Sequence, residues 1–243
     1  MTFATVQVRP RSKSNRRWPK KQHSRLKLLV KNDSSRKWLY HEEMAYRSGY
    51  QMIAGVDEAG RGPLAGPVVA AAVIFPEGVI IEGIEDSKRL SPQRREKLFE
   101  VITREAIDWS IGTTDHTVID QLNILIATHL AMRKAIHKLN PGPDFILVDG
   151  FTIPDCTIKQ IGIKDGDRLS QSIAAASILA KVTRDRIMEE YDHKFPGYGF
   201  ARHKGYPTRD HCQAIAQYGI CEIHRKSFSP IRKLAINLQK VGQ

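Results

Sequence analysis

Long apolar runs and paired cysteines are both scarce in this chain of 243 residues. The longest apolar stretch, Val68–Phe75, is far shorter than the ~18 residues of a membrane-spanning helix, so the sequence predicts no membrane span. The three cysteines include no CxxC pair, and their odd number argues against a disulfide framework. We therefore expect reduced thiols in a cytoplasmic protein.

A zinc site is one alternative for two of the cysteines. Cys212 and Cys221 lie close in sequence to His211 and His224, and thiolate and imidazole are both zinc ligands. Their spacing is irregular compared with the known zinc-binding patterns, which argues against this alternative.

Acidic residues are almost absent from the first 40 residues, which contain twelve Lys or Arg and a single acid, Asp33. This segment carries +11 of the net charge of +12, so the other 203 residues are nearly neutral. Because it is also poor in apolar periodicity, we expect residues 1–37 to be a disordered basic extension and residues 38–243 to be the folded domain. The extension could be a phosphate-binding arm or an organellar transit peptide, and we favour the arm.

Beyond the extension, apolar periodicity predicts alternating strands and helices. Early strands in direct succession, followed by strands that alternate with helices, predict a mixed sheet with helices packed on it, which is an α/β fold. Strands are expected at Met52–Asp57, Val68–Phe75, Trp109–Thr114, Phe145–Asp149 and Lys159–Ile163, and helices at Trp38–Arg47, Pro92–Ile107, Thr117–Leu139, Ser172–Phe195 and Thr208–Tyr218.

The glycine-rich segment 60–66 resembles a dinucleotide-binding loop only superficially. It follows a strand, and Asp86 lies about twenty residues further on, as in that fingerprint. However, Pro63 and Pro67 interrupt the segment, and an apolar strand follows it where the fingerprint needs a helix. Without a helix N-terminus to receive a pyrophosphate, dinucleotide binding is excluded here.

Three of the expected strands lead into carboxylates. Asp57 and Glu58 end the first, Asp149 ends the fourth, and the fifth is followed by Asp165 and Asp167. If these strand ends are neighbours in one sheet, their charges repel one another, and a divalent cation relieves that repulsion. Acids at strand ends are also common turn formers, but three such ends together favour a metal site. An all-oxygen site suits Mg²⁺ or Mn²⁺.

A series of ordered motifs lies along the chain: Ile53–Pro63, Asp86–Lys88, Val148–Gly150, Gly166–Asp167, Ala174–Asp185 and His203–Thr208. Together these motifs resemble those of the bacterial ribonuclease HII family. The resemblance implies a ribonuclease H-like fold, with a five-stranded mixed sheet flanked by helices and a small helical C-terminal portion. It also implies a monomeric endonuclease that hydrolyses the RNA strand of RNA–DNA hybrids and cuts 5′ of single ribonucleotides in duplex DNA.

The resemblance further implies a two-metal reaction that leaves a 3′-hydroxyl and a 5′-phosphate, with a role in ribonucleotide removal and DNA repair. The four residues that match the family's catalytic and metal-binding acids are Asp57, Glu58, Asp149 and Asp167. Asp167 takes the fourth place because it, and not Asp165, keeps the family's distance to the Ala-Ala-Ser-Ile run.

Substrate recognition is implied by two further motifs. In the family, the loop Gly60-Arg61-Gly62 reads the 2′-hydroxyl of the ribonucleotide, and a tyrosine that matches Tyr206 packs on the neighbouring sugar. We expect Asp185 to pair with Arg184 or Lys181. Candidate phosphate contacts are Lys88, Lys181, Arg184 and Lys204, while His203 and His211 are expected to be phosphate contacts or structural residues.

Two other functions remain open from the sequence. One is another ribonuclease H-like nuclease, such as a junction resolvase, against which the Gly-Arg-Gly loop and Tyr206 argue. The other is a non-catalytic nucleic-acid-binding protein that works through its basic extension.

Overall fold

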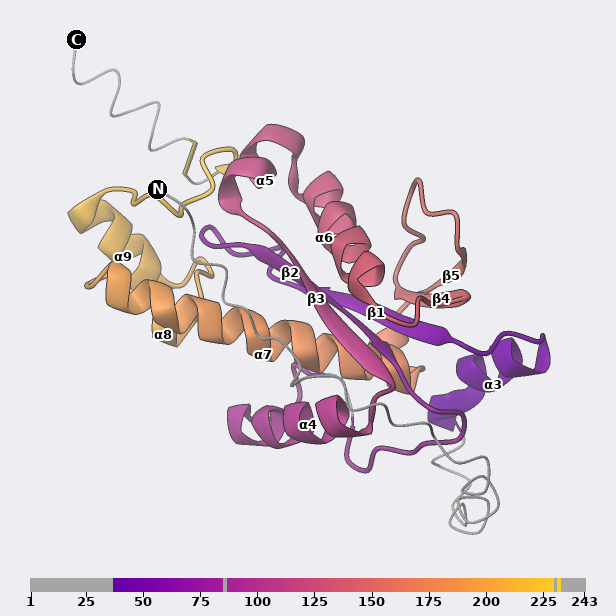
Figure 1. Cartoon of the computed structure of the whole chain (residues 1–243). Coiled ribbons are helices and arrows are strands. Elements are labelled where there is room, and N and C mark those ends of the chain that lie inside the picture. The colour runs from indigo at the N-terminus through magenta and orange to yellow at the C-terminus, as the bar shows by residue number, and fades with distance from the viewer. Residues whose placement is uncertain (1–36, 85–86, 230, 233–243) are drawn as a thin grey trace. The chain divides into compact units, whose positions relative to one another are not determined.

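The computed structural model describes residues 37–84, 87–229 and 231–232 (Figure 1). The predictions for residues 1–36 and for Asp86 therefore lie outside the described residues. In chain order the elements are η1 (Lys37–Leu39), α3 (Tyr40–Arg47), β1 (Ile53–Ala59), β2 (Val68–Ile74), α4 (Pro92–Glu105), β3 (Asp108–Thr114), α5 (His116–Leu122), α6 (Ile124–Lys138), β4 (Phe145–Asp149), β5 (Lys159–Ile163), η2 (Gly166–Arg168), α7 (Gln171–Lys194), α8 (Phe200–His203) and α9 (Arg209–Tyr218).

The five strands form one sheet in the order β3-β2-β1-β4-β5. The hairpin-like neighbours β1, β2 and β3 pair antiparallel, whereas β1, β4 and β5 pair parallel. The predicted five-stranded mixed sheet is thus confirmed. Strand β1 runs two residues further than expected, because its pairing with β2 continues to Ala59 opposite Val69.

Helices cover both faces of the sheet (Figure 1): α5 and α6 lie on one side and α4 and α7 on the other. Strand β2 lies inside the sheet, and all of its side chains are buried because each face contacts a helix layer. This two-sided burial explains the continuous apolar run Val68–Ile74, which does not alternate between apolar and polar residues.

Two glycines allow a helix to approach the sheet backbone very closely. A Cβ on Gly55 of β1 would lie 2.1 Å from the carbonyl carbon of Ser172, at the start of α7. On the opposite face, a Cβ on Gly112 of β3 would lie 2.0 Å from the carbonyl oxygen of Ala131 in α6. Real Cβ atoms do not approach backbone this closely, so the position of α7 on β1 depends on Gly55.

The single helix predicted for Thr117–Leu139 is wrong, because the structure has two helices there. Asn123 separates α5 from α6 and has a positive φ of 72°. Its side-chain oxygen accepts hydrogen bonds from the N–H groups of Leu125 and Ile126, at 2.9 and 3.1 Å, and so caps α6. This cap satisfies the first N–H groups of α6, which lets the chain begin a new helix directly after α5.

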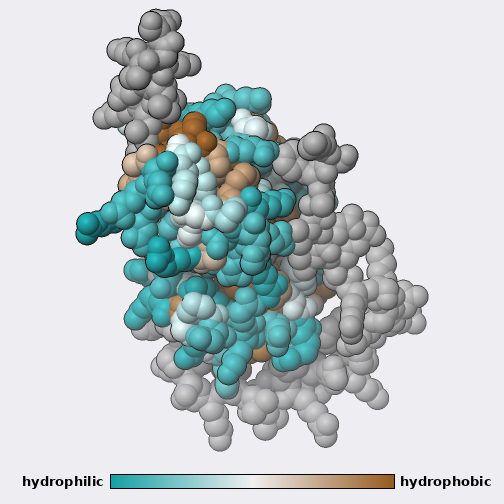
Figure 2. Space-filling view, turned by 90° about the vertical axis from the view of Figure 1, so that its left-hand side faces the viewer, coloured by the Kyte–Doolittle hydropathy of each residue, from teal (hydrophilic) through white to brown (hydrophobic). Residues whose placement is uncertain are grey.

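The predicted helical C-terminal portion is confirmed and has its own apolar cluster. Residues of α8 and α9 and the end of α7 surround Phe200, together with Leu64 and Ala65 from the loop after β1. The molecular face at the α9 end is mostly hydrophilic (Figure 2), in keeping with the burial of this cluster. Among the helices described, none is both long and apolar enough to cross a membrane.

Candidate active site

Asp57 and Asp149 lie side by side because β1 and β4 are parallel neighbours. The last paired residues of the two strands are Val56 and Val148, and each aspartate follows directly. Strand side chains alternate between faces, so Asp57 and Asp149 point to the α7 side and Glu58 to the other side of the sheet rim. Asp57 is only 5% exposed.

The pKa values of Asp57 and Glu58 are raised, because both carboxylates are removed from solvent and lie close to other negative charges. Burial raises the pKa of Asp57 well above its ordinary value, and the nearby charges of Glu58 and Asp149 raise it further. A hydrogen bond from Ser177 on α7 acts in the opposite direction. Burial also raises the pKa of Glu58, although Arg61 opposes this shift through an ion pair of 3.2 Å.

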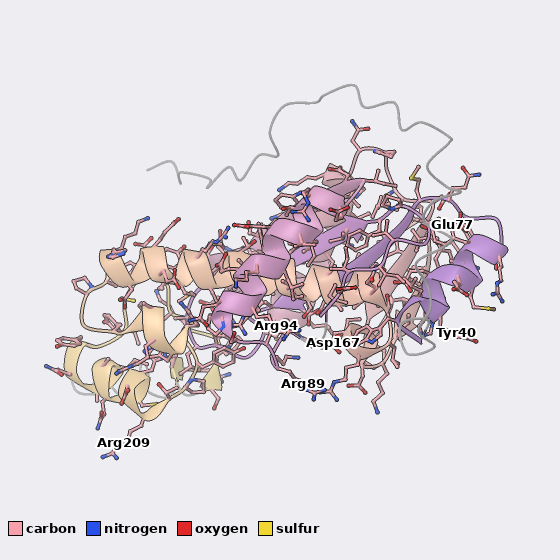
Figure 3. The ribbon with its side chains drawn as sticks, turned by 90° about the horizontal axis from the view of Figure 1, so that it is seen from below. Tyr40, Glu77, Arg89, Arg94, Asp167 and Arg209 are labelled. Atoms are coloured by element: carbon pink, nitrogen blue, oxygen red, sulfur yellow. The ribbon has the colours of Figure 1, made fainter. Side chains whose placement is uncertain are left out.

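Asp167 belongs to the same end of the sheet through its neighbour Gly166. The N–H of Gly166 donates a 2.7 Å hydrogen bond to Oδ1 of Asp149, which ties η2 to the end of β4. Asp167 is 6% exposed, and Nζ of Lys88 lies 4.0 Å from its Oδ2. Figure 3 shows Asp167 in the central part of the molecule, away from Tyr40 at the α3 end.

Carboxylate oxygens are suitable ligands for a hard divalent cation, but the side chains of these acids are not arranged as a coordination group. Within the described ranges, no three His, Cys, Asp or Glu side chains form a group that could hold a metal ion. The predicted metal-binding residues therefore remain a prediction as far as geometry is concerned. Their chemistry fits Mg²⁺ or Mn²⁺, because the donors are carboxylates and the pKa values of two of them, Asp57 and Glu58, are raised.

The loop 60–66 begins immediately after the acids and lies against Tyr206. Arg61 and Gly62 are exposed, whereas Gly60 is buried with a φ of +97°. A Cβ built on Gly62 would lie 3.6 Å from Cε1 of Tyr206, whose side chain is itself partly exposed. The two motifs predicted to recognise the ribonucleotide are thus in contact, although about 140 residues separate them in the sequence.

The prediction that Arg184 contacts phosphate is wrong. Arg184 is 1% exposed, and its guanidinium donates to the backbone carbonyls of Pro67, Ala65 and Lys204 at 3.0 to 3.1 Å. Burial lowers its pKa to about 10, so it stays a cation at neutral pH. Arg184 is therefore part of the interior under the loop.

The three predicted phosphate-binding lysines are in different situations. Lys88 is 80% exposed close to Asp167, where a phosphate could reach it. Lys181 donates to Asp185 at 2.8 Å, which confirms the pairing expected for that acid, and Arg95 also approaches Asp185 at 3.7 Å. Lys204, which directly follows α8, binds Glu189 at 2.6 Å, so a phosphate would have to compete with an acid at both Lys181 and Lys204.

Sequence reasoning missed Arg225, which is 0% exposed. Its guanidinium donates to the carbonyls of Gly60, Arg61 and Gly66 at 2.6, 3.0 and 3.0 Å. Burial, and secondarily the charge of Arg184, lower its pKa to about 9. No local pattern could have indicated this role, because the bonded residues are up to 165 positions away.

The histidines near Tyr206 form a neutral structural network. Nδ1 of His211 lies 2.9 Å from the carbonyl oxygen of Tyr206, and its Nε2 lies 3.1 Å from Nε2 of His224. Burial lowers the pKa of both imidazoles to about 4. The zinc alternative finds no support, because Cys212 is exposed and these ring nitrogens bond one another.

Comparisons with known proteins agree with this architecture. A family model described as Ribonuclease HII matches residues 54–231. A ribonuclease HII of Acetivibrio thermocellus is 58% identical over 189 residues, which cover 78% of this chain and 74% of that protein. The solved ribonuclease H2 of Pyrococcus horikoshii OT3 is 30% identical with a TM-score of 0.65, and the match covers 78% of this chain and 99% of that one.

A third similar protein extends the comparison of folds. The solved structure of Bst-RNase HIII in complex with Mn²⁺ has a TM-score of 0.58 at 18% identity, covering 81% of this chain and 73% of that one. This likeness shows the ribonuclease H-like fold, which confirms the predicted fold class. Together with the family match over residues 54–231, these findings show that the chain is an endoribonuclease and belongs to the ribonuclease HII family.

Proposed function

We propose that this endoribonuclease cuts the RNA strand of RNA–DNA hybrids and the 5′ side of single ribonucleotides embedded in duplex DNA, in the service of ribonucleotide removal and DNA repair. The observation that carries the proposal is one juxtaposition. Neighbouring carboxylates lie at the ends of β1 and β4, the Gly-Arg-Gly loop with its exposed Arg61 and Gly62 follows β1, and Tyr206 lies against that loop.

The four acids Asp57, Glu58, Asp149 and Asp167 are proposed to hold two divalent cations, Mg²⁺ or Mn²⁺. Bound there, the cations would supply a water of lowered pKa and stabilise the charge on the departing 3′ oxygen. Asp57 contributes most to the attraction of a cation, because it is buried between the charges of Glu58 and Asp149. The Gly166 N–H holds the Asp149 carboxylate toward η2 and thereby limits its rotation.

Discrimination of RNA from DNA needs a contact with the 2′-hydroxyl. The exposed backbone of Arg61 and Gly62 supports this role, because glycine leaves the backbone open to close approach. Tyr206 offers an apolar ring next to Gly62, on which the neighbouring sugar can pack. Lys88 is the cation best exposed for a phosphate contact beside Asp167.

A substrate panel tests the proposed function. We expect the protein to cut a duplex with one ribonucleotide and an RNA–DNA hybrid, to leave a 5′-phosphate, and to need Mg²⁺ or Mn²⁺. A matched all-DNA duplex and an all-DNA four-way junction should stay intact. Cleavage of the all-DNA junction would favour the junction-resolvase alternative, and no cleavage of any substrate with metal present would reject the proposal.

Replacing the aromatic ring of Tyr206 should affect substrate choice more than metal dependence. Because contacts between an aromatic ring and a nucleotide contribute about 1–3 kcal/mol, Tyr206→Ala should lower the preference for the single-ribonucleotide duplex over the RNA–DNA hybrid by about tenfold. The measurement is the ratio of kcat/KM for the two substrates. Tyr40→Ala, which changes a 58% exposed tyrosine at the other end of the molecule, serves as the control. A ratio unchanged by Tyr206→Ala would refute the assignment.

A further inference from the structure

Two buried arginines bond the backbone of the loop after β1. Arg184 comes from the middle of α7 and Arg225 from the segment after α9, so two distant parts of the chain meet beneath this loop. Both guanidinium groups point at main-chain oxygens. Together they donate to five carbonyls of the loop, those of Gly60, Arg61, Ala65, Gly66 and Pro67.

Burying the two arginine side chains in the interior is energetically unfavourable compared with burying apolar side chains there. A buried cation costs free energy unless it is paired or fully hydrogen-bonded. In the part of the chain that the structure describes, neither Arg184 nor Arg225 forms an ion pair with a carboxylate. Their partners are carbonyls, and only the planar fork of arginine directs several N–H groups at several oxygens at once. The two guanidinium groups therefore serve to fix the backbone conformation of the loop.

The bonds determine which way the loop's amide groups face. In a trans peptide the C=O and the following N–H point in opposite directions. The carbonyls of Gly60 and Arg61 point at Arg225, so the N–H groups of Arg61 and Gly62 point away from it. Both residues are exposed, and neither N–H donates to another described residue. The loop thus presents two amide donors outward.

Only glycine fits at the first position of this arrangement. Gly60 has a φ of +97°, a conformation that other residues rarely adopt. A Cβ at this position would also lie 2.1 Å from Nε of Arg184. The buried arginine and the glycine therefore depend on each other.

Arg184 also connects the loop to the segment that carries Tyr206. Besides the loop carbonyls, it donates to the carbonyl of Lys204 at 3.0 Å. The next residue, Gly205, accepts a 2.8 Å hydrogen bond from the N–H of Leu64, so loop and segment are also bonded directly. Arg184 thus ties the far end of the loop, at Ala65 and Pro67, to the segment that carries Tyr206.

We propose that Arg225 and Arg184 are positioning residues for ribonucleotide recognition. Arg225 aims the N–H groups of Arg61 and Gly62 at the 2′-hydroxyl, and Arg184 holds the Tyr206 segment beside the loop. This inference rests on the proposed function of the loop. It assigns the two arginines a part in substrate discrimination, without contact with the substrate or with the reacting atoms.

Arg225→Lys and Arg184→Lys test the inference, because lysine keeps the charge but loses the fork of donors. The readout is the ratio of dissociation constants for an all-DNA duplex and a matched duplex with one ribonucleotide, measured with Ca²⁺ as the only divalent ion. We expect each variant to lower this ratio by about tenfold, as misaligned hydrogen bonds to the hydroxyl would. Arg47→Lys, on the exposed surface of α3, should leave the ratio unchanged.

The ratio of the two dissociation constants distinguishes a loss of positioning from a loss of folded protein. A partly unfolded variant weakens both dissociation constants by the same factor, so its ratio stays at the wild-type value. An unchanged ratio in both lysine variants would therefore overturn the inference while leaving the proposed function intact. A wild-type protein that binds both duplexes equally would overturn the proposed recognition of the 2′-hydroxyl by the loop, and the inference with it, whereas the proposed cleavage is tested separately by the substrate panel.

A measurement on the wild-type protein covers the case in which the variants do not fold. Amide hydrogen exchange of Arg61 and Gly62 should be fast in the free protein, since their N–H groups face outward. Binding of the single-ribonucleotide duplex should slow it, and the all-DNA duplex should not. Slow exchange of both amides in the free protein would contradict the geometry on which the inference depends.

Discussion

Asp57→Asn is expected to lower the rate of cleavage by roughly a thousandfold or more while leaving duplex binding almost unchanged. The substitution removes one negative charge from the most buried point of the acid cluster, between Glu58 and Asp149. Loss of several kcal/mol of cation-dependent stabilisation corresponds to a rate change of this size. Single-turnover cleavage of a duplex with one ribonucleotide, together with its dissociation constant, measures both quantities.

Asp165→Asn is the matched control for this substitution. Asp165 is exposed, two residues from the proposed ligand Asp167, and has a φ of 55°, which asparagine tolerates as well as aspartate does. We expect near wild-type cleavage from this variant. Full activity of Asp57→Asn with metal present would contradict the proposed site, and would favour the non-catalytic alternative if deletion of residues 1–37 also abolished nucleic-acid binding.

Gly55→Ala is expected to destabilise the protein by about 3 kcal/mol or more, the largest effect on stability that we predict. The added methyl group would lie 2.1 Å from a backbone atom of Ser172 and 2.4 Å from the nitrogen of Ile173. Neither atom can move without displacing α7 from β1. Because α7 also carries Ser177 and Arg184, cleavage should fall as well. Urea unfolding of the purified variant measures the free energy of unfolding.

Gly142→Ala provides the comparison. Nothing lies within 4 Å of a Cβ built on Gly142, and its φ is not positive, so the same chemical change meets open space. Its free energy of unfolding should be within about 0.5 kcal/mol of the wild type. Equal stability of the two variants would show that α7 does not pack on β1 as closely as described.

Strand ends were the best-predicted part of the site. The apolar runs that lead into Asp57 and Asp149 marked two strands correctly, because a strand buried on both faces is continuously apolar. Whether these ends meet depends on the parallel pairing of β1 with β4, which no local pattern encodes. The resemblance to ribonuclease HII supplied that adjacency, and the pairing of Val56 with Val148 bears it out.

The two errors among the helices have different causes. The run Thr117–Leu139 contains neither Gly nor Pro, so the break at Asn123 depends on a left-handed backbone conformation that the apolar pattern does not reveal. The predicted phosphate contact of Arg184 requires an exposed side chain, which is the usual situation of a charged residue in a helix. Helix α7 is buried on nearly every side along its first half, and the side facing the loop contains this arginine.

Arg225 could not be predicted from the sequence at all. It is one of 38 basic residues, and nothing in its neighbours distinguishes it from the others. Its structural role depends entirely on hydrogen bonds to the carbonyls of Gly60, Arg61 and Gly66, which are distant in the sequence. Recognition of the motifs located the loop, whereas the three-dimensional contacts were needed to explain how the loop keeps its shape.

The central claim is that the four acids together form one site that holds two divalent cations. Anomalous diffraction from crystals grown with Mn²⁺ and a duplex carrying a ribonucleotide tests it most directly, because the ions are then located without any assumption about activity. The account predicts Mn²⁺ peaks in contact with Asp57 and with at least two of Glu58, Asp149 and Asp167, whose side chains should be drawn together relative to the metal-free arrangement. Mn²⁺ bound elsewhere, with these carboxylates still apart, would contradict it.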